Sequence, residues 1–345
     1  MPRILALDLW VILVRRWVAC DSPPSPTLST LVACWPDTCP PTPTWRYPAL
    51  DATAEATVLV KHENVQPTGA FKVRGGIALL DAMDPAERDR GIVGYSTGNH
   101  AQSLAYAAAL FGVRCTIVMP ENPNPAKARA VAGFGAEVVE AGANFDQARE
   151  HAEMLAHAHG MNLISAANDP RIIAGVATVY LELFEQAPDL DVVVVPVGGG
   201  SGAAAACLVA AALAPSCEVI AVQSAASPAG HDSWRAGACL QRPNQTVADG
   251  LATGSGFELT QQIMRTHLTD FVLVDDAAIA AAQWVMMRDA HTLAEGAGAA
   301  ALAAVLADPQ RFAGRRVGVV CTGGNAAETE IRACATREHE LASSA

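Results

Sequence analysis

The sequence predicts an α/β protein with open, mostly parallel sheets that are covered by helices. Short runs of β-branched residues alternate with alanine-rich segments of helical periodicity along most of the chain. Strands joined by crossover helices have this pattern, and they form parallel sheets. A chain of 345 residues that is 51% hydrophobic is long enough to bury one large core or two moderate ones.

The predicted strands are short apolar runs, and the segments between them carry the helical pattern. In chain order, the strands are Val58–Val60, Ile92–Tyr95, Cys115–Met119, Glu137–Val139, Val192–Val197, Val219–Val222, Phe271–Val274 and Val317–Val320. The predicted helices are Ala101–Phe111, Phe145–His157, Ile172–Gln186, Gly202–Leu213, Ala277–Ala290 and Ala297–Leu306. Ligands of such sheets bind beyond the carboxyl ends of strands, so functional residues are expected in the loops that follow the strands.

Residues 1–40 are predicted to be an N-terminal extension ahead of the folded part, which is expected to begin near Pro41. The segment Met1–Val18 is apolar, but four charged residues interrupt it. It therefore fits neither a membrane span nor a secretory signal. Residues Asp21–Pro43 are rich in proline and small polar residues, a composition typical of a tether or an extended arm.

The overall charge excludes two classes of partner. A net charge of -12 and a pI near 5.2 argue against a nucleic acid or an anionic membrane, both of which require a basic face. The nine cysteines are scattered and lack metal-ligand spacing, so neither a disulfide framework nor a zinc site is expected. A reducing cytoplasm is the predicted location.

The segment Gln66–Gly76 contains the candidate nucleophile, Lys72, where a short loop leads into a predicted helix. The chain has few lysines, and this one lies among apolar and small residues. Burial there would lower the pKa of the amine, and a neutral amine can form a Schiff base. The alternative is a lysine at a helix start whose stem packs while its amine reaches water.

The loop Ser96–His100 follows a predicted strand and precedes a predicted helix. Its hydroxyl and N–H groups can converge on an anion, and a substrate carboxylate would fit. Helix capping by Ser96 or Asn99 explains the same residues, and His100 fits a structural role equally well.

The loop Gly198–Gly202 follows the strand Val192–Val197 and precedes an alanine-rich helix. Bare N–H groups in that position bind phosphate. With Ala203, the loop also fits the dinucleotide fingerprint, so an NAD-dependent oxidoreductase is a rival interpretation. The next strand ends at Gln223, where that fingerprint requires an acidic residue for the ribose, and this difference favours a monophosphate.

The loop Cys321–Asn325 places a neutral hydroxyl, that of Thr322, after the last predicted strand. On their own, Gly323 and Gly324 indicate only a turn. Taken together, a buried lysine, a carboxylate site, a phosphate site and a neutral hydroxyl describe a pyridoxal-phosphate site that acts on an amino acid. A protein that binds the cofactor or an amino acid without turnover is the remaining rival.

Four motifs in order resemble the serine/threonine dehydratase (threonine ammonia-lyase) group of fold-type-II pyridoxal-phosphate enzymes. They are Lys61–Lys72, Ser96–Gln102, Gly198–Gly202 and Thr322–Asn325. The resemblance runs from about residue 43 to residue 325 and implies two three-layer α/β/α domains with the cofactor in the cleft between them. It implies a large cofactor-binding domain, residues 41–90 and 169–345, a small domain, residues 91–168, and a homodimer.

The same resemblance implies roles for individual residues around the cofactor. Lys72 would hold it as a Schiff base, Phe71 would pack on its ring, and Asn99 would hydrogen-bond its phenolic oxygen. Thr322 would face the pyridine nitrogen, and Glu295 would lie beside the cofactor, although helix capping explains Glu295 equally well. The phosphate would be bound by Gly198, Gly199, Gly200, Ser201 and Gly202.

The implied reaction is elimination of water from L-threonine or L-serine to give a 2-oxo acid and ammonia. Lys72, Ser96 and Thr97 would be the catalytic residues, and the substrate carboxylate would be held by Ser96, Thr97, Gly98, Asn99 and His100. Serine and hydroxyaspartate racemases share this site, but they use a serine hydroxyl where this chain has Thr97. The added methyl group and stiffer rotamer of threonine disfavour racemisation. Hydroxyaspartate, phenylserine and a hydroxyectoine-derived substrate stay open.

No metal is predicted at the site. Several relatives bind a divalent cation through an acidic residue at the strand end that Gln223 occupies here. The segment Gln223–Ala229 has no carboxylate, and hard divalent cations prefer such ligands. A monovalent ion is the alternative at this position.

Overall fold

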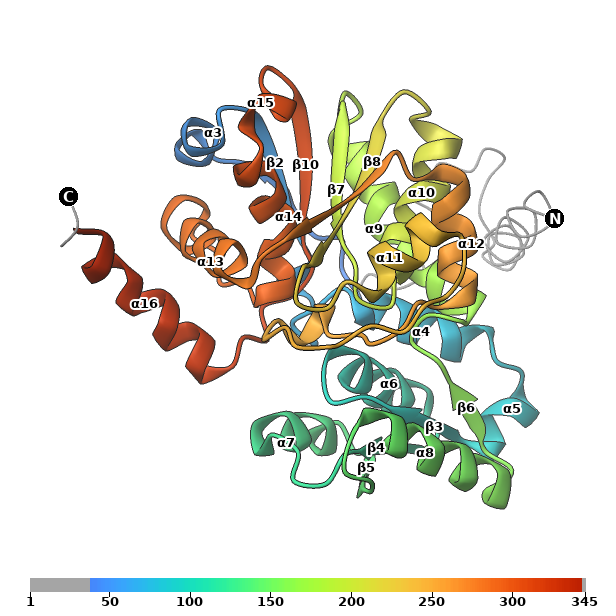
Figure 1. The fold of residues 1–345 in the computed structure, drawn as a ribbon. Helices are drawn as coiled ribbons and strands as arrows, with labels where there is room; N and C mark the ends of the chain where they lie inside the picture. Colours follow the sequence, from blue (N-terminus) through green and yellow to red (C-terminus); the bar gives the residue numbers. More distant parts are fainter. Residues whose placement is uncertain (1–37, 343–345) are drawn as a thin grey trace.

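The computed structural model describes residues 38–342, which form two α/β units with one sheet each (Figure 1). The larger sheet has the strand order β1-β2-β10-β7-β8-β9, and the smaller has the order β5-β4-β3-β6. Every strand pair is parallel except β1 with β2, which is antiparallel. The predicted fold class is therefore confirmed, whereas most of the predicted N-terminal extension lies outside the described residues.

The strands of the larger sheet come from both ends of the chain, and those of the smaller sheet come from one continuous segment. The larger sheet contains β1 (Thr44–Arg46), β2 (Thr57–His62), β7 (Val192–Pro196), β8 (Glu218–Ser224), β9 (Asp270–Val274) and β10 (Arg316–Cys321). The smaller sheet contains β3 (Ile92–Tyr95), β4 (Cys115–Met119), β5 (Glu137–Glu140) and β6 (Asn162–Ile164). The sequence pattern missed β1 and β6, which have three residues each.

Helices fill most of the connections between strands. In chain order they are α3 (Pro48–Ala54), α4 (Lys72–Ala82), α5 (Pro85–Arg90), α6 (Asn99–Phe111), α7 (Pro125–Gly133), α8 (Phe145–His159), α9 (Pro170–Gln186), α10 (Ser201–Leu213), α11 (Ala229–Ala236), α12 (Glu258–His267), α13 (Asp276–Ala290), α14 (Gly296–Ala307), α15 (Pro309–Phe312) and α16 (Glu328–Ala342). Two short 3-10 helices, η1 (Glu63–Val65) and η2 (Asp249–Leu251), lie in loops. The helices α3, α5, α7, α11, α12 and α15 were not predicted.

Both faces of the larger sheet are buried, which is why its central strands are continuous apolar runs. Val192 and Val194 of β7 pack on the side of α14, whereas Val193 and Val195 pack on the side of α9 and α10. The smaller sheet is built in the same way, with α8 on one face and α6 on the other. Each unit is thus a three-layer α/β/α arrangement.

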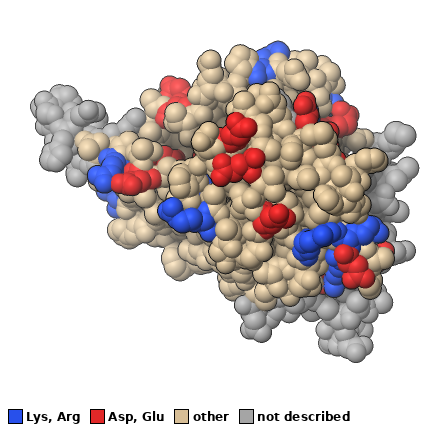
Figure 2. All heavy atoms as spheres, turned by 90° about the horizontal axis from the view of Figure 1, so that it is seen from below, with Lys and Arg blue, Asp and Glu red and all other residues tan. Residues whose placement is uncertain are grey.

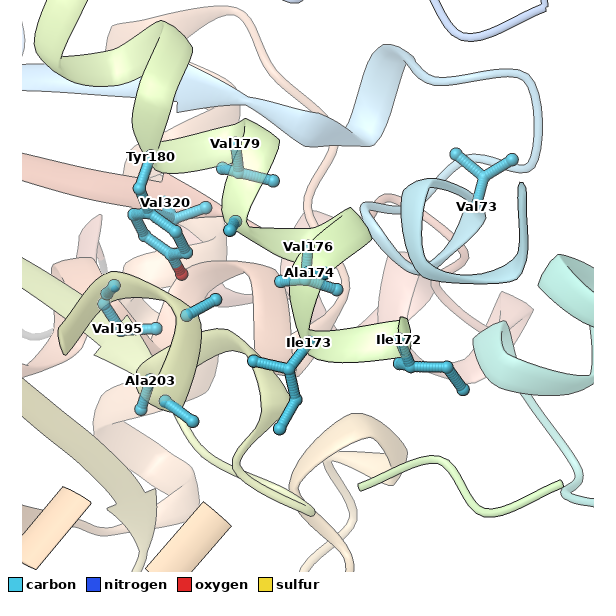
Figure 3. Packing of buried hydrophobic residues seen from close by; sticks show 14 of the residues in the cluster. Val73, Ile172, Ile173, Ala174, Val176, Val179, Tyr180, Val195, Ala203 and Val320 are labelled. Carbon is cyan, nitrogen blue, oxygen red and sulfur yellow. The ribbon is translucent and has the colours of Figure 1, made fainter. Parts of the chain in front are cut away.

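Helix α9 connects the core to the helix that begins at Lys72. Figure 3 gathers its buried side chains, among them Ile173 and Tyr180, with Val195 of β7 and Val320 of β10. Gly175 allows α9 to approach α4 closely, because a Cβ atom there would lie 2.3 Å from the backbone oxygen of Arg74. The start of α4 is therefore fixed on a rigid layer.

The surface carries charges of both signs. On the face shown in Figure 2, basic side chains lie in separate small groups among acidic ones and form no continuous basic area. This distribution agrees with the net negative charge of the chain. Within residues 38–342, no helix has the length and apolar character needed to cross a membrane.

Candidate active site

One cavity of about 390 Å³ contains every predicted site residue. It is lined by residues of both α/β units, and the loops after β3, β7 and β10 all open into it. The predicted residues on its wall are Phe71, Lys72, Ser96, Thr97, Gly98, Asn99, His100, Gly198, Gly199, Gly200, Ser201, Gly202, Glu295 and Thr322. The fold thus brings together four motifs that are far apart in the sequence.

Lys72 is the first residue of α4, and its amine is directed into the cavity. The Nζ atom donates a hydrogen bond to Ser201 Oγ at 2.8 Å and lies 4.9 Å from the centroid of the Phe71 ring. Burial lowers the pKa of Lys72 from 10.5 to about 8. These contacts match the predicted nucleophile and not a lysine whose amine reaches water.

Backbone contacts fix the loop that precedes Lys72. The N–H of Phe71 donates to the Thr322 oxygen at 3.0 Å, and Asn325 Nδ2 donates to the Thr68 oxygen at 2.8 Å. Gly69 has a φ of +68°, and a Cβ atom there would lie 2.5 Å from Asn325 Oδ1. The loops before α4 and after β10 therefore form one wall of the cavity.

The loop 198–202 has the shape of a phosphate cradle. Gly200 has a φ of +89° and is the N-cap of α10. Cβ atoms at Gly199 and Gly200 would lie 3.0 Å from Ala167 Cβ and 2.9 Å from Thr260 Oγ1, so side chains would not fit there. The first N–H groups of α10 have no partner inside the helix, and the helix dipole favours an anion at this end.

Asn99 does not cap α6, although capping was a possible role from the sequence. The helix begins at Asn99, its N-cap is Gly98, and no side chain makes the capping bond. Instead, Asn99 Nδ2 donates to Glu295 Oε1 at 2.6 Å, and Asn99 Oδ1 accepts from Asn325 Nδ2 at 2.8 Å. Ser96 Oγ accepts the N–H of Gly98 at 3.2 Å within the loop. The side-chain amide of Asn99 is thus held in place by Glu295 and Asn325, which also line the cavity.

His100 is a buried neutral histidine on the cavity wall. Burial, assisted by the charge of Lys72, lowers the pKa of His100 to about 3. Its Nε2 atom is buried and has no hydrogen-bond partner among the described residues. A structural histidine with satisfied ring nitrogens does not match this observation, whereas a histidine that contacts a bound ligand does.

Glu295 is the N-cap residue of α14, but its side chain does not make the capping bond. The carboxyl group is turned toward Asn99 and the cavity, where burial raises its pKa from 4.5 to about 7. A neutral carboxyl group is therefore present over part of the acidic pH range.

The raised pKa of Glu295 predicts a pH-dependent stability of the cofactor-free protein. The folded state binds an extra proton between pH 4.5 and 7, so stability should fall as pH rises through this window. Glu295→Gln should remove that loss, which is about 3.5 kcal/mol over the whole window at roughly 1.4 kcal/mol per pKa unit, with about 2–3 kcal/mol of it between pH 5 and pH 7.5. Denaturant unfolding at pH 5 and pH 7.5 measures the difference. The exposed Glu153→Gln is the control and should keep the native pH dependence; the same slope in Glu295→Gln would contradict the prediction.

Residues 165–169 and 248–256 were expected to contribute to the substrate pocket, but the sequence did not single out several individual residues of the cavity wall. Lys127 of α7 and Asp249 of η2 form an ion pair that joins the two α/β units. Asn244, Thr253, Tyr95, Phe145 and Phe257 also line the wall. The only signal for Lys127 in the sequence is that it is one of three lysines.

The amide of Gln223 makes a hydrogen bond through its oxygen and another through its nitrogen. Its Oε1 atom accepts the N–H of His231 at 3.0 Å, and its Nε2 atom donates to Thr253 Oγ1 at 3.4 Å. In the described part of the chain, no group of three or more His, Cys, Asp or Glu residues is arranged to hold a metal ion. That no divalent cation binds at this strand end stays a prediction.

The cavity fits the cofactor that the motifs indicate. It offers a neutralisable amine at Lys72, a glycine cradle at a helix N-terminus, and a neutral hydroxyl at Thr322. The unpartnered ring nitrogen of His100 adds a buried polar atom without a protein partner. A phosphorylated aldehyde held by an amine matches this set of groups.

Comparison with known proteins gives a consistent result. Residues 37–323 match the family described as pyridoxal-phosphate dependent enzyme. The chain is 38% identical to an L-threonine ammonia-lyase of Thermotoga maritima over 78% of this chain and 67% of that protein. It is 35% identical to a beta-hydroxyaspartate dehydratase of Paracoccus denitrificans over 80% of this chain and 88% of that protein. Threonine deaminase isoform 2 of Solanum lycopersicum superposes with a TM-score of 0.85 at 26% identity, covering 95% of this chain and 92% of that one.

Proposed function

The chain belongs to the pyridoxal-phosphate dependent enzymes, as an ammonia-lyase of the dehydratase group, and we propose that it eliminates water from L-threonine or L-serine. The products are a 2-oxo acid and ammonia. The observation that carries the proposal is the buried amine of Lys72, whose pKa is lowered to about 8, in one cavity with the loop Ser96–His100 and the glycine loop 198–202.

Pyridoxal phosphate, when bound, supplies a conjugated ring that accepts negative charge from the α-carbon of an amino acid. The role of the protein is to hold the cofactor and to orient it. Lys72 would hold the aldehyde carbon, the loop 198–202 the phosphate, and Asn99 the phenolic oxygen. Thr322 is neutral and cannot keep a ring nitrogen protonated as a carboxylate would, which favours prompt elimination over transamination.

Lys72 is also the proposed general base, a role that it would take once the amine of the substrate has replaced it at the aldehyde carbon. A pKa of about 8 leaves a usable fraction of the amine neutral near pH 7, and Ser201 Oγ at 2.8 Å orients the Nζ atom. The loop Ser96–His100 would hold the substrate carboxylate and so orient the substrate in the cavity. Loss of the β-hydroxyl as water leaves an enamine that hydrolyses to the 2-oxo acid and ammonia.

The charges of the cavity wall support a neutral substrate side chain. Among residues 38–342, Lys127 is the one other lysine or arginine on the wall besides Lys72, and it forms an ion pair with Asp249. A second carboxylate on the substrate, as in 3-hydroxyaspartate, would have to compete with Asp249 for that amine. The similarity to a beta-hydroxyaspartate dehydratase keeps this acidic substrate as the second candidate.

Asp249→Asn is expected to shift substrate preference toward an acidic side chain. Without its partner, the amine of Lys127 is available to a substrate carboxylate, and a hydrogen bond to a charged group contributes about 1.5–3 kcal/mol. The ratio of kcat/KM for 3-hydroxyaspartate to that for threonine should therefore rise roughly tenfold or more. Adding Lys127→Met should cancel the gain. An unchanged ratio in Asp249→Asn would mean that this pair does not sense the substrate.

A panel of β-hydroxy amino acids tests the function directly. Each is assayed for release of 2-oxo acid and for the inverted enantiomer. Release from threonine or serine without inversion is expected, because Thr97 is a poor second acid for racemisation. Release from 3-hydroxyaspartate alone would support the second candidate, inversion would support a racemase, and binding without turnover would support a non-catalytic protein.

A further inference from the structure

Gln223 lies at the carboxyl end of β8 and is fully buried. The orientation of its amide follows from its partners, because the N–H of His231 can only donate and must face the amide oxygen. The amide nitrogen therefore faces Thr253 Oγ1 and donates to it. Since the hydroxyl receives a proton from this side, its own proton is free to point elsewhere.

The proton of Thr253 points to the glycine loop. Thr253 Oγ1 donates to the carbonyl oxygen of Gly198 at 3.2 Å. A second hydroxyl supports the next peptide, because Thr260 Oγ1 donates to the carbonyl oxygen of Gly199 at 2.8 Å. Both hydroxyl groups therefore donate to carbonyl oxygens of the glycine loop.

These two bonds decide where the N–H groups of the loop point. In a planar trans peptide, the carbonyl of one residue and the N–H of the next point in opposite directions. Holding the oxygen of Gly198 aims the N–H of Gly199 the other way, and holding the oxygen of Gly199 does the same for the N–H of Gly200. Both residues line the cavity, so these are the donors available to a phosphate.

We propose that Gln223, acting through Thr253, is a positioning residue that orients the Gly198–Gly199 peptide toward the cofactor phosphate. The inference rests on the proposed function only in that pyridoxal phosphate is the ligand of the cavity. In this chain the amide donates to Thr253, whereas a carboxylate without a bound cation would accept the proton of Thr253 and withdraw it from Gly198. The role of Gln223 is therefore to direct a hydroxyl proton.

Gln223→Glu tests the proposal with little change of volume. Its dissociation constant for pyridoxal phosphate, measured by titrating the full chain after removal of the cofactor, should rise roughly tenfold, which corresponds to about 1.4 kcal/mol. The phosphorus NMR shift of the bound phosphate should change. At saturating cofactor, KM for the amino acid should stay within about twofold, since the substrate-binding loop is not altered.

Four further variants separate positioning from a general loss of stability. Thr253→Val should weaken cofactor binding as much as Gln223→Glu, and the double variant should be no weaker than either, because both break one relay. Thr253→Ser should restore affinity. Gln261→Glu also places a carboxylate at a buried position, but Gln261 Nε2 donates to the Gly230 oxygen and not to the loop. It should lower the melting temperature and leave cofactor affinity and the phosphorus shift unchanged.

Two results would overturn the proposal: native cofactor affinity in Thr253→Val, or additive losses in the double variant. Thr253→Val decides the question even if Gln223→Glu does not fold. Failure of the proposed function would look different, because the native chain would then bind pyridoxal phosphate without releasing 2-oxo acid from threonine or serine.

Discussion

Lys72→Ala is expected to abolish both the visible absorbance of the bound cofactor and the release of 2-oxo acid. The variant removes the amine that is proposed to hold the cofactor and to accept the α-proton. General-base catalysis alone contributes about 10²–10⁴-fold, so a loss of roughly 10⁴-fold or more in kcat is expected when both roles are lost. Absorbance spectra of the purified protein and 2-oxo acid assays with threonine and serine measure the two effects.

Lys127→Ala is the matched control, because Lys127 lines the same cavity. It should keep the visible absorbance. Borohydride reduction followed by digestion and mass spectrometry should place the pyridoxyl group on the peptide of Lys72 in both the native protein and the control. The remaining lysine, Lys61, is buried and paired with Glu182 at 2.7 Å. A pyridoxyl mass on the peptide of Lys61 or Lys127, or turnover in Lys72→Ala, would assign the attachment elsewhere.

The central strands were predictable because they are buried on both faces. Runs such as Val192–Val197 have no polar alternation, which distinguishes them from half-exposed strands. Strand β1 carries no such signal, since it has only three residues and two of them, Trp45 and Arg46, are exposed. Helix α7 is rich in small residues, so its helical periodicity is weak, and α11 has only eight residues, too few for a periodic pattern to be recognised.

Site residues were predictable where the loop sequence determines the local backbone geometry. They were not predictable where the interacting residue is distant in the sequence. The glycine loop indicates a phosphate cradle through its backbone alone. Asn99 and Glu295, by contrast, fit local capping as well as a bond to each other, and only the fold chooses between these roles. The pair Lys127–Asp249 has no local signal at all, because it comes from two units of the fold.

A buried ionic network anchors the helix that begins at Lys72. Arg74 Nε is 2.7 Å from Glu63 Oε2, and Arg74 Nη1 is 2.5 Å from Glu182 Oε1. Lys61 pairs with the same Glu182, and all four side chains are nearly inaccessible to solvent. Arg74 thus joins α4 to η1 on one side and to α9 on the other. Buried charges of this kind depend on their partners, since water does not solvate them.

Arg74→Met is expected to destabilise the protein by about 3–5 kcal/mol at pH 7, because it leaves buried carboxylates without their main partner. Burial alone would raise the pKa of Glu63, but the charge and hydrogen bonds of Arg74 outweigh it and hold that pKa below 4.5. A lowered folded pKa stabilises the protein above pH 4.5, and this contribution is lost as pH falls through the folded pKa. The deficit of Arg74→Met should therefore shrink in acid. Denaturant unfolding of both proteins at pH 7 and at pH 4 measures it.

Arg332→Met is the control, because it removes an arginine charge without removing a buried ion pair. Arg332 and Glu328 form an ion pair on α16, and both side chains are 76% exposed. Exposed pairs of this spacing contribute about 0.3–0.5 kcal/mol, so this variant should unfold almost as the native protein does at either pH. If Arg74→Met lost no more stability than Arg332→Met, the network would not anchor α4, and the position of Lys72 would have to depend on the packing of α4 against α6 and α9 and on the backbone contacts of the preceding loop.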